Sequence, residues 1–320
     1  MGNLETLLHS VETIFTFFLI GVLGYYLAKI GWFTAESSAM FSQLLTKIVI
    51  PVNLFYNIQI AMTRREFIAN SGSMLIPILS IVIAIGVGWL VARAARLPRS
   101  HRSIFITAFA CSNTINIGLP INTALFGDTA LPAILIYYMA NTIVFWTFGN
   151  YLLASDSKTR EPAPVLSMTT AKRVFSPAFL AFVVGALFLL AGIPLPATLG
   201  NAMKYVGNMV TPVSTMCIGI AIFETGFKNI KVDREILLLC LGRFVISPLI
   251  LVGLLYLMPV PELTYKVFLI QASLPPMSSI ALLAIFYQTD TKFASVAVSF
   301  TTLCALVTVP IYMQILSWMF

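Results

Sequence analysis

Long apolar stretches recur along almost the whole chain, and no other feature constrains its fold as strongly. Each is close to the roughly 20 residues that a helix needs to cross about 30 Å of hydrocarbon. Charged residues make up only 10% of the 320 residues, against about 25% in a soluble domain. Because so few charges cannot cover a water-facing surface, we predict an all-α integral membrane protein in contact with a lipid bilayer. Ten transmembrane helices are expected, at residues 11–30, 38–58, 73–94, 103–124, 129–153, 175–193, 198–223, 236–257, 264–287 and 293–318.

Basic residues are concentrated in alternate loops. Of the 19 lysines and arginines, thirteen lie on one side of the predicted membrane and four on the other. Because cytoplasmic loops carry the excess of Lys and Arg, this bias places both termini outside the cytoplasm in a multi-pass protein of the plasma (inner) membrane. The net charge of +7 therefore reflects orientation, and no nucleic-acid partner is expected. The thirteen are Lys29, Arg93, Arg96, Arg99, Arg102, Lys158, Arg160, Lys172, Arg173, Lys228, Lys231, Arg234 and Lys292, and the four are Arg64, Arg65, Lys204 and Lys266.

A polar, proline-containing segment near the midpoint divides the chain into two halves. An offset of 161 residues aligns Gly24 with Gly185 and Pro51 with Pro212. Because five spans is an odd number, two related halves must insert with opposite orientations, and inverted repeats are typical of secondary transporters. We therefore predict a first five-span repeat at residues 1–155, a cytoplasmic linker at 156–173 and a second five-span repeat at 174–320.

The fourth and ninth apolar stretches put polar residues and prolines at membrane depth. Pro275 and Pro276 lack a backbone donor and clash with a continuing helix, so nearby backbone groups must find partners in protein, water or a ligand. A broken helix also directs its positive N-terminal end into the membrane, where it can receive an anion. We predict that both helices are broken and cross at the substrate. The alternative is two kinked helices whose Ser and Asn side chains bond back to their own backbone.

Ten polar or proline residues of these two stretches form the expected binding site. Neutral amides and hydroxyls can replace the water around a carboxylate without trapping the anion. Gly118 and Pro120 are assigned to the structure of the crossing itself. We expect the four residues from the fourth stretch to face the serines of the ninth. The ten are Ser112, Asn113, Thr114, Asn116, Gln271, Ser273, Pro275, Pro276, Ser278 and Ser279.

Two cations lie inside predicted spans, whereas no Asp or Glu falls in the middle of any span. At about 1.5 Å per residue, Lys47 and Arg243 lie roughly 10–15 Å into their spans, and an intramembrane charge is a functional candidate. Lys47 either acts in coupling or extends its amine to the cytoplasmic face. Arg243 either attracts substrate or pairs helices. Cations without buried carboxylates favour an anionic cargo, and neither a metal site nor a cofactor is expected.

The residues of these spans resemble the auxin efflux carriers and their bacterial relatives over nearly the whole chain. The resemblance implies ten helices in two inverted five-helix repeats. Spans one, two, six and seven would form a scaffold, with a homodimer through spans two and seven. Spans three to five and eight to ten would form the transport domain, with Asn113 at the substrate carboxylate. The motifs are Asn113-Thr114 with Gly118-Leu119-Pro120, Ser273-Leu274-Pro275, Arg243-Phe244 with Pro248, and Val307-Thr308-Val309-Pro310-Ile311.

Two departures from the plant carriers favour the bacterial branch. The central polar segment is short, and Pro276 stands where those carriers usually have a polar residue. The bacterial branch resembles carriers of malate, malonate and similar acids. We therefore expect a secondary transporter of a small mono- or dicarboxylate, malate-like, malonate-like or auxin-like, that works by alternating access. Import of an anion would need a proton or sodium co-ion.

Three other function classes make different demands on the sequence. A cation-coupled antiporter of similar architecture needs a buried carboxylate, and none is predicted. A membrane sensor with a carrier fold would bind the ligand without net transport, and the sequence leaves it open. An enzyme is not expected, because the chain has two histidines, no HExxH motif and no buried carboxylates for acid–base catalysis.

Overall fold

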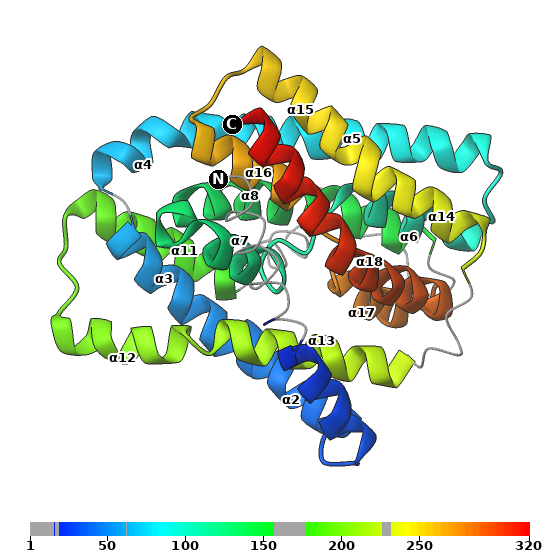
Figure 1. Cartoon of the computed structure of the whole chain (residues 1–320), viewed down its shortest axis with the longest axis horizontal. Coiled ribbons are helices and arrows are strands. Elements are labelled where there is room, and N and C mark those ends of the chain that lie inside the picture. The colour runs from blue at the N-terminus through cyan, green and yellow to red at the C-terminus, as the bar shows by residue number, and fades with distance from the viewer. Residues whose placement is uncertain (1–15, 17–18, 62, 157–176, 226–231) are drawn as a thin grey trace.

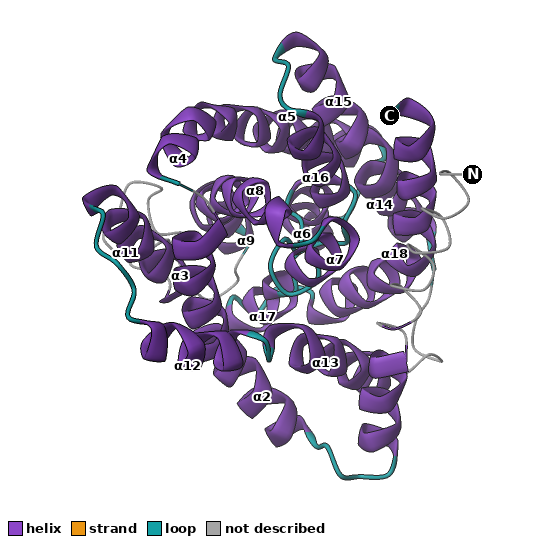
Figure 2. Cartoon of the chain, turned by 60° about the vertical axis from the view of Figure 1, so that its left-hand side comes forward, coloured by secondary structure: helices purple, strands orange, loops and turns teal. Residues whose placement is uncertain are grey.

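The computed structural model describes residue 16 and residues 19–61, 63–156, 177–225 and 232–320. These residues form helices and loops without a strand (Figure 2), which confirms the predicted all-α class. Nearly all of the predicted linker, the start of the first predicted span and residues 226–231 lie outside the described residues. The described helices are Leu19–Lys29, α2 (Ala35–Leu44), α3 (Ile50–Ala61), α4 (Arg64–Ser71), α5 (Leu75–Ala94), α6 (Arg99–Ala110), α7 (Gly118–Phe126), α8 (Leu131–Val144), α9 (Asn150–Ser155), α11 (Pro177–Ala191), α12 (Ala197–Gly207), α13 (Val210–Thr225), α14 (Arg234–Leu241), α15 (Ser247–Leu257), α16 (Glu262–Ala272), α17 (Ser279–Phe286) and α18 (Thr291–Met319).

Four helices in the described ranges are long and apolar enough to cross a membrane. They are Gly72–Ala94, Asp128–Ser155, Arg234–Leu257 and Thr291–Met319. Each coincides with a predicted span within two residues at either end. Shorter apolar helices cover parts of the first and sixth predicted spans. The arrangement of ten spans as two inverted five-helix repeats stays a prediction.

The fourth and ninth apolar stretches are each interrupted, as the sequence predicted. α6 ends at Ala110 and α7 begins at Gly118, whereas α16 ends at Ala272 and α17 begins at Ser279. Pro120 lies in the first turn of α7, where a missing N–H costs no helical hydrogen bond. The interruption therefore follows from local chemistry.

The seventh stretch was predicted as one continuous helix, and the structure corrects this. α12 ends at Gly207 and α13 begins at Val210, with a turn between them. Pro212 accounts for the turn, because it has no N–H and its ring clashes with the carbonyl of Asn208, four residues earlier.

Two π-helical segments contain the two cations of the predicted spans. Lys47 lies in η1 (Leu45–Val49) and Arg243 in η6 (Gly242–Ile246). Each segment is followed, two residues later, by a proline. Proline cannot donate to the carbonyl four residues earlier, and before Pro248 that carbonyl belongs to Phe244. The hydroxyl of Tyr312 donates to it instead, so this irregular backbone is satisfied by a distant side chain.

Helix contacts fall into two groups (Figure 1). In the α3 group, α3 packs against α11 and α12, and α13 packs against α2. In the α5 group, α5 packs against α6, α8 and α15, while α16 packs against α7, α8 and α18. Contacts of α3 with α8 and of α13 with α18 join the two groups. The discontinuous helices α6, α7, α16 and α17 all belong to the α5 group.

The two glycines that the sequence offset aligned both mark close helix contacts. A Cβ atom on Gly185 of α11 would lie 2.4 Å from Ile58 of α3. A Cβ atom on Gly24 would lie 2.3 Å from the carbonyl oxygen of Met216 in α13. In both cases a side chain would not fit unless the contacting atoms moved, so each aligned glycine has a packing role.

Candidate functional site

The two interrupted stretches cross each other through their backbones. Ser112 and Pro276 form an antiparallel bridge. The N–H of Asn113 donates to the carbonyl of Pro275 at 2.9 Å, and the N–H of Met277 donates to the carbonyl of Cys111 at 3.2 Å. These bonds satisfy groups that the broken helices leave unpaired. We call residues 111–117 and 273–278 the crossover.

Asn113 and Ser278 meet at the crossover, as the sequence predicted. The Asn113 side-chain amide donates to the Ser278 hydroxyl oxygen at 2.7 Å. The Asn113 carbonyl also accepts from the N–H of Gly118 at 3.0 Å, at the start of α7. Asn113 is 2% exposed. Because an Asn amide has two N–H donors, one of them remains for a ligand.

Asn141 of α8 is hydrogen-bonded to the backbone of the crossover. This residue was not identified from the sequence. Its side-chain oxygen accepts from the Ser112 N–H at 3.0 Å, and its amide donates to the Ser112 carbonyl at 2.9 Å. Its side chain is fully buried. The available signal was an Asn in the middle of an otherwise apolar span. This residue therefore replaces, for Ser112, the backbone pairing that the helix break removed.

Gln271, in the ninth stretch, forms a hydrogen bond to the fourth stretch. Its amide donates to the Thr114 carbonyl at 3.3 Å. A Cβ atom on Gly118 would lie 2.2 Å from the Gln271 side-chain oxygen and 2.6 Å from Leu274, so any side chain at the first residue of α7 would displace these two side chains. The sequence assignment of Gly118 to the crossing thus has a steric basis.

Several buried oxygens near the crossover have no hydrogen-bond donor within the described residues. They belong to the side chains of Asn116, Asn122 and Gln271. A carboxylate offers only acceptors, so it cannot satisfy these oxygens. A ligand hydroxyl, a protonated carboxyl group or a small cation could do so. The crossover thus presents acceptors beside the donors that the sequence led us to expect.

Ser273, which the sequence places opposite the fourth stretch, makes its side-chain hydrogen bond within the ninth. Its hydroxyl donates to the carbonyl of Ile270 at 2.9 Å, within its own helix, and the side chain is fully buried. This is the bonding pattern that the kinked-helix alternative described. Ser279 is the first residue of α17. Asn113 and Ser278 are therefore the side-chain pair that the structure brings together across the crossover.

Arg243 binds the ends of both broken helices. Its side chain is fully buried. It donates to the carbonyls of Phe109 at 3.0 Å and Leu274 at 2.8 Å, to the carbonyl of Ala272, and to the Ser112 hydroxyl at 2.5 Å. The last carbonyls of a helix have no intrahelical partner and form its negative end, so a planar cation with several donors suits them. The geometry favours the helix-pairing interpretation of Arg243.

Lys47 lies away from these contacts. Its side chain is exposed, and its ammonium donates to the Gln43 side-chain oxygen at 3.2 Å, one turn earlier. The residue thus reaches a polar partner on its own helix. Its assignment to coupling stays a prediction.

His101 contacts two acidic residues from other segments of the chain. It lies in the first turn of α6, half-buried, with its ring stacked on Phe293 at 4.2 Å between centroids. Its two ring nitrogens lie 2.5 Å from Glu235 and 3.2 Å from Asp290. Partial burial raises the pKa of Asp290, but the Phe293 N–H and the nearby His101 lower that pKa more, so it lies below its ordinary value. His101 therefore connects α6, α14 and α18.

Comparison with known proteins gives consistent results over almost the full length. The family described as membrane transport protein matches residues 9–313. An uncharacterized transporter of Methanothermobacter thermautotrophicus is 25% identical over 96% of this chain and 98% of its own length. A protein of Rhizobium meliloti named "Putative malonate transporter" is 23% identical over 92% and 91%. An uncharacterized transporter of Escherichia coli K12 is 22% identical over 93% and 94%.

Proposed function

This chain belongs to the membrane transport protein family, and from that membership we propose that it is a secondary transporter of a small organic anion. The family match also confirms the resemblance to the auxin efflux carriers and their bacterial relatives. A similar protein is named for malonate. The proposed cargo is therefore a mono- or dicarboxylate such as malonate or malate, carried across the plasma membrane by alternating access.

The crossover is the observation that carries this proposal. A carboxylate needs hydrogen-bond donors, and the second N–H of the Asn113 amide can supply one. The N-terminal ends of α7 and α17 add the positive ends of two helix dipoles. All of these groups are neutral, so they can bind an anion and still release it. A fixed ammonium at the same depth would bind it more tightly and release it more slowly.

The acceptor oxygens near the crossover support a second bound group. The unpaired oxygens of Asn116, Asn122 and Gln271 suit a proton donor or a small cation. A hydroxyl on the transported acid, as in malate, would satisfy one of them. A proton or sodium ion that travels with the anion would do the same, and it would allow import against an inside-negative potential.

The two groups of helices support a division of the protein into a fixed domain and a moving domain. We assign the α3 group to a scaffold and the α5 group, with the crossover, to a transport domain that moves relative to it. In this proposal the scaffold also forms a homodimer through the second and seventh spans. Asn113 and Ser278 would then move together, because both belong to the same group.

Uptake of organic acids tests the transport function. Purified protein in proteoliposomes should take up at least one of malonate, malate, lactate and indole-3-acetate, labelled with radioisotope, faster than protein-free liposomes. Uptake should saturate with concentration, because the site is a discrete set of hydrogen bonds. An imposed proton or sodium gradient should change the rate if a co-ion is used.

Three results would redirect the assignment. Saturable binding of an acid without uptake would favour a sensor with a carrier fold. Proton or sodium exchange without any acid would favour a cation-coupled antiporter. Neither binding nor uptake of any acid in the panel would contradict the proposed function.

Orientation is tested by labelling. We expect both termini to lie outside the cytoplasm, because of the bias of basic residues among the loops. In a variant whose four cysteines are replaced, a cysteine at Gly2 or Met319 should react with an impermeant thiol reagent in intact cells. A cysteine at Ser155 should react only after lysis. The reverse pattern would invert the topology.

A further inference from the structure

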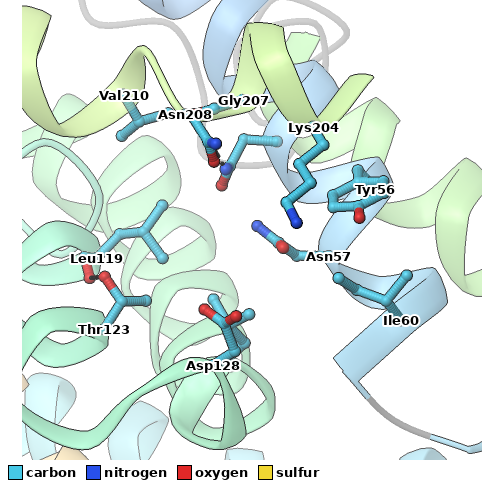
Figure 3. Close-up of a pocket in the computed structure, with 12 residues that line it drawn as sticks. Tyr56, Asn57, Ile60, Leu119, Thr123, Asp128, Lys204, Gly207, Asn208 and Val210 are labelled. Carbon is cyan, nitrogen blue, oxygen red and sulfur yellow. Dashed lines mark hydrogen bonds between the residues drawn. The ribbon is translucent and has the colours of Figure 1, made fainter. Parts of the chain in front are cut away.

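A polar cavity lies between the α3 group and the turn from α7 to α8 (Figure 3). Its volume is about 200 Å³. It contains none of the residues predicted to bind substrate, so it is separate from the crossover. One wall comes from α3 and α12, and the opposite wall comes from α7 and η3 (Asp128–Ala130). Its polar lining consists of Asn53, Tyr56, Asn57, Thr123, Asp128, Lys204 and Asn208.

The lining contains an ammonium and a buried amide that are available to a ligand. Lys204 lies in the last turn of α12, and its ammonium points into the cavity toward Asn57 (Figure 3). No ion pair among the described residues involves Lys204. Asn57 is only 9% exposed, and its amide has no hydrogen-bond partner within the described residues. A buried, unpartnered amide beside an ammonium is a combination that suits a carboxylate.

Three other polar side chains of the lining are hydrogen-bonded to the backbone or oppose an anion, and the Asn53 side-chain oxygen has no donor within the described residues. The Asn53 amide donates to the Gly207 carbonyl at 3.2 Å, which holds α3 on α12. The Thr123 hydroxyl donates to the Leu119 carbonyl at 2.8 Å. The exposed Asp128 carboxylate would repel a bound anion. Lys204 supplies the positive charge for an anion here, the neutral groups of Asn57, Tyr56 and Asn208 can add hydrogen bonds, and Asp128 opposes binding.

We propose that this cavity is an approach site, at which Lys204 and Asn57 bind the carboxylate of the transported acid before it reaches the crossover. This inference rests on the proposed function. Leu119 and Thr123 line the cavity and lie on α7, whose first residue, Gly118, donates its N–H to the Asn113 carbonyl of the crossover at 3.0 Å. The helix therefore connects the two sites. An exposed lysine binds weakly enough to let the acid move on.

The test compares two lysines that the sequence places on the same side of the membrane. Lys204→Gln removes the ammonium from the cavity, whereas Lys266→Gln removes one that pairs with Glu262 on α16. The probe is the acid of the four-member panel with the highest wild-type uptake. With the acid supplied on the Lys204 face, Lys204→Gln should raise KM on the order of tenfold, because a charge-assisted hydrogen bond is lost. Lys266→Gln should leave the KM on this face at the wild-type value.

Salt supplies a second readout. Added salt screens an exposed charge, so it should raise the wild-type KM on the Lys204 face. In Lys204→Gln this dependence should be much flatter, and in Lys266→Gln it should stay at the wild-type slope. Thermal unfolding in detergent, equal for both variants and wild type, would exclude a folding defect as the cause.

Asp128→Asn separates an anion site from a simple ion pair between the cavity walls. Without the repelling carboxylate, KM on the Lys204 face should fall about threefold. If Asp128→Asn raises KM as Lys204→Gln does, the two charges act on each other and the approach site is wrong. It is also wrong if the wild type transports an acid while Lys204→Gln keeps the wild-type KM and salt dependence on both faces. If the wild type transports no acid, the proposed function itself fails.

Discussion

Replacement of Arg243 by Gln should reduce uptake about tenfold or more and lower the temperature of thermal unfolding. Arg243 is fully buried and makes four hydrogen bonds to the ends of α6 and α16 and to the crossover. A Gln amide has two N–H donors on a shorter side chain, so it must leave several of these acceptors unpaired. Each unsatisfied buried acceptor costs about 1–3 kcal/mol. Uptake in proteoliposomes and thermal unfolding in detergent measure the two effects.

Arg243→Lys distinguishes the geometry of the planar guanidinium group from its positive charge, because Lys keeps only the charge. An ammonium presents three donors from one point and cannot reach acceptors spread over both helix ends, so this variant should also be impaired. Arg93→Gln is the matched control, because Arg93 is exposed near the end of α5. Wild-type uptake and stability in Arg243→Lys would contradict the geometric role. A rise in KM alone, with normal stability, would instead point to substrate attraction.

Asn113→Ala should weaken substrate binding tenfold to a hundredfold, because a charge-assisted hydrogen bond is worth roughly 1.5–3 kcal/mol. The side chain is 2% exposed and reaches across the crossover to Ser278. Its remaining N–H is the donor that we assign to the substrate carboxylate. The backbone contacts of residue 113 do not involve the side chain, so the crossing itself should persist. KM for the best-transported acid, together with equilibrium binding, is the measurement.

Ser278→Ala is the matched control for the contact between the two stretches. It removes the same hydrogen bond at 2.7 Å but leaves the Asn113 amide in place. We therefore expect a smaller effect on KM than in Asn113→Ala. Equal losses in the two variants would assign the effect to the link between the stretches. Wild-type transport of every tested acid by Asn113→Ala would show that the crossover is scaffolding.

The helical framework follows from the sequence because its causes are local. Runs of apolar residues of membrane-spanning length set the helices, and prolines and glycines interrupt them. Pro275 and Pro276 end α16 by chemistry that acts within one turn. The break in the seventh span has the same kind of cause, because Pro212 acts on the carbonyl of Asn208 within one turn. Its signal is therefore local and present in the sequence.

The partners of individual side chains depend on tertiary structure. A transmembrane helix is apolar on nearly every face, so hydropathy does not indicate which face meets which neighbour. Arg243 was identified as a buried cation, but its bond to the Phe109 carbonyl spans 134 residues of sequence. The contact of Asn141 with Ser112 likewise cannot be predicted from hydropathy, because it joins two different segments of the chain.

The cavity beside Lys204 gives the clearest contrast between the two levels. The sequence alone determined that the chain is built from apolar helices with two interrupted ones, because those features arise within about 20 residues. It placed Asn57, Asp128 and Lys204 in three unrelated segments. Only the packing of α3 and α12 against the turn after α7 brings these side chains around one space. Such a site depends on contacts between distant segments, and no local pattern encodes them.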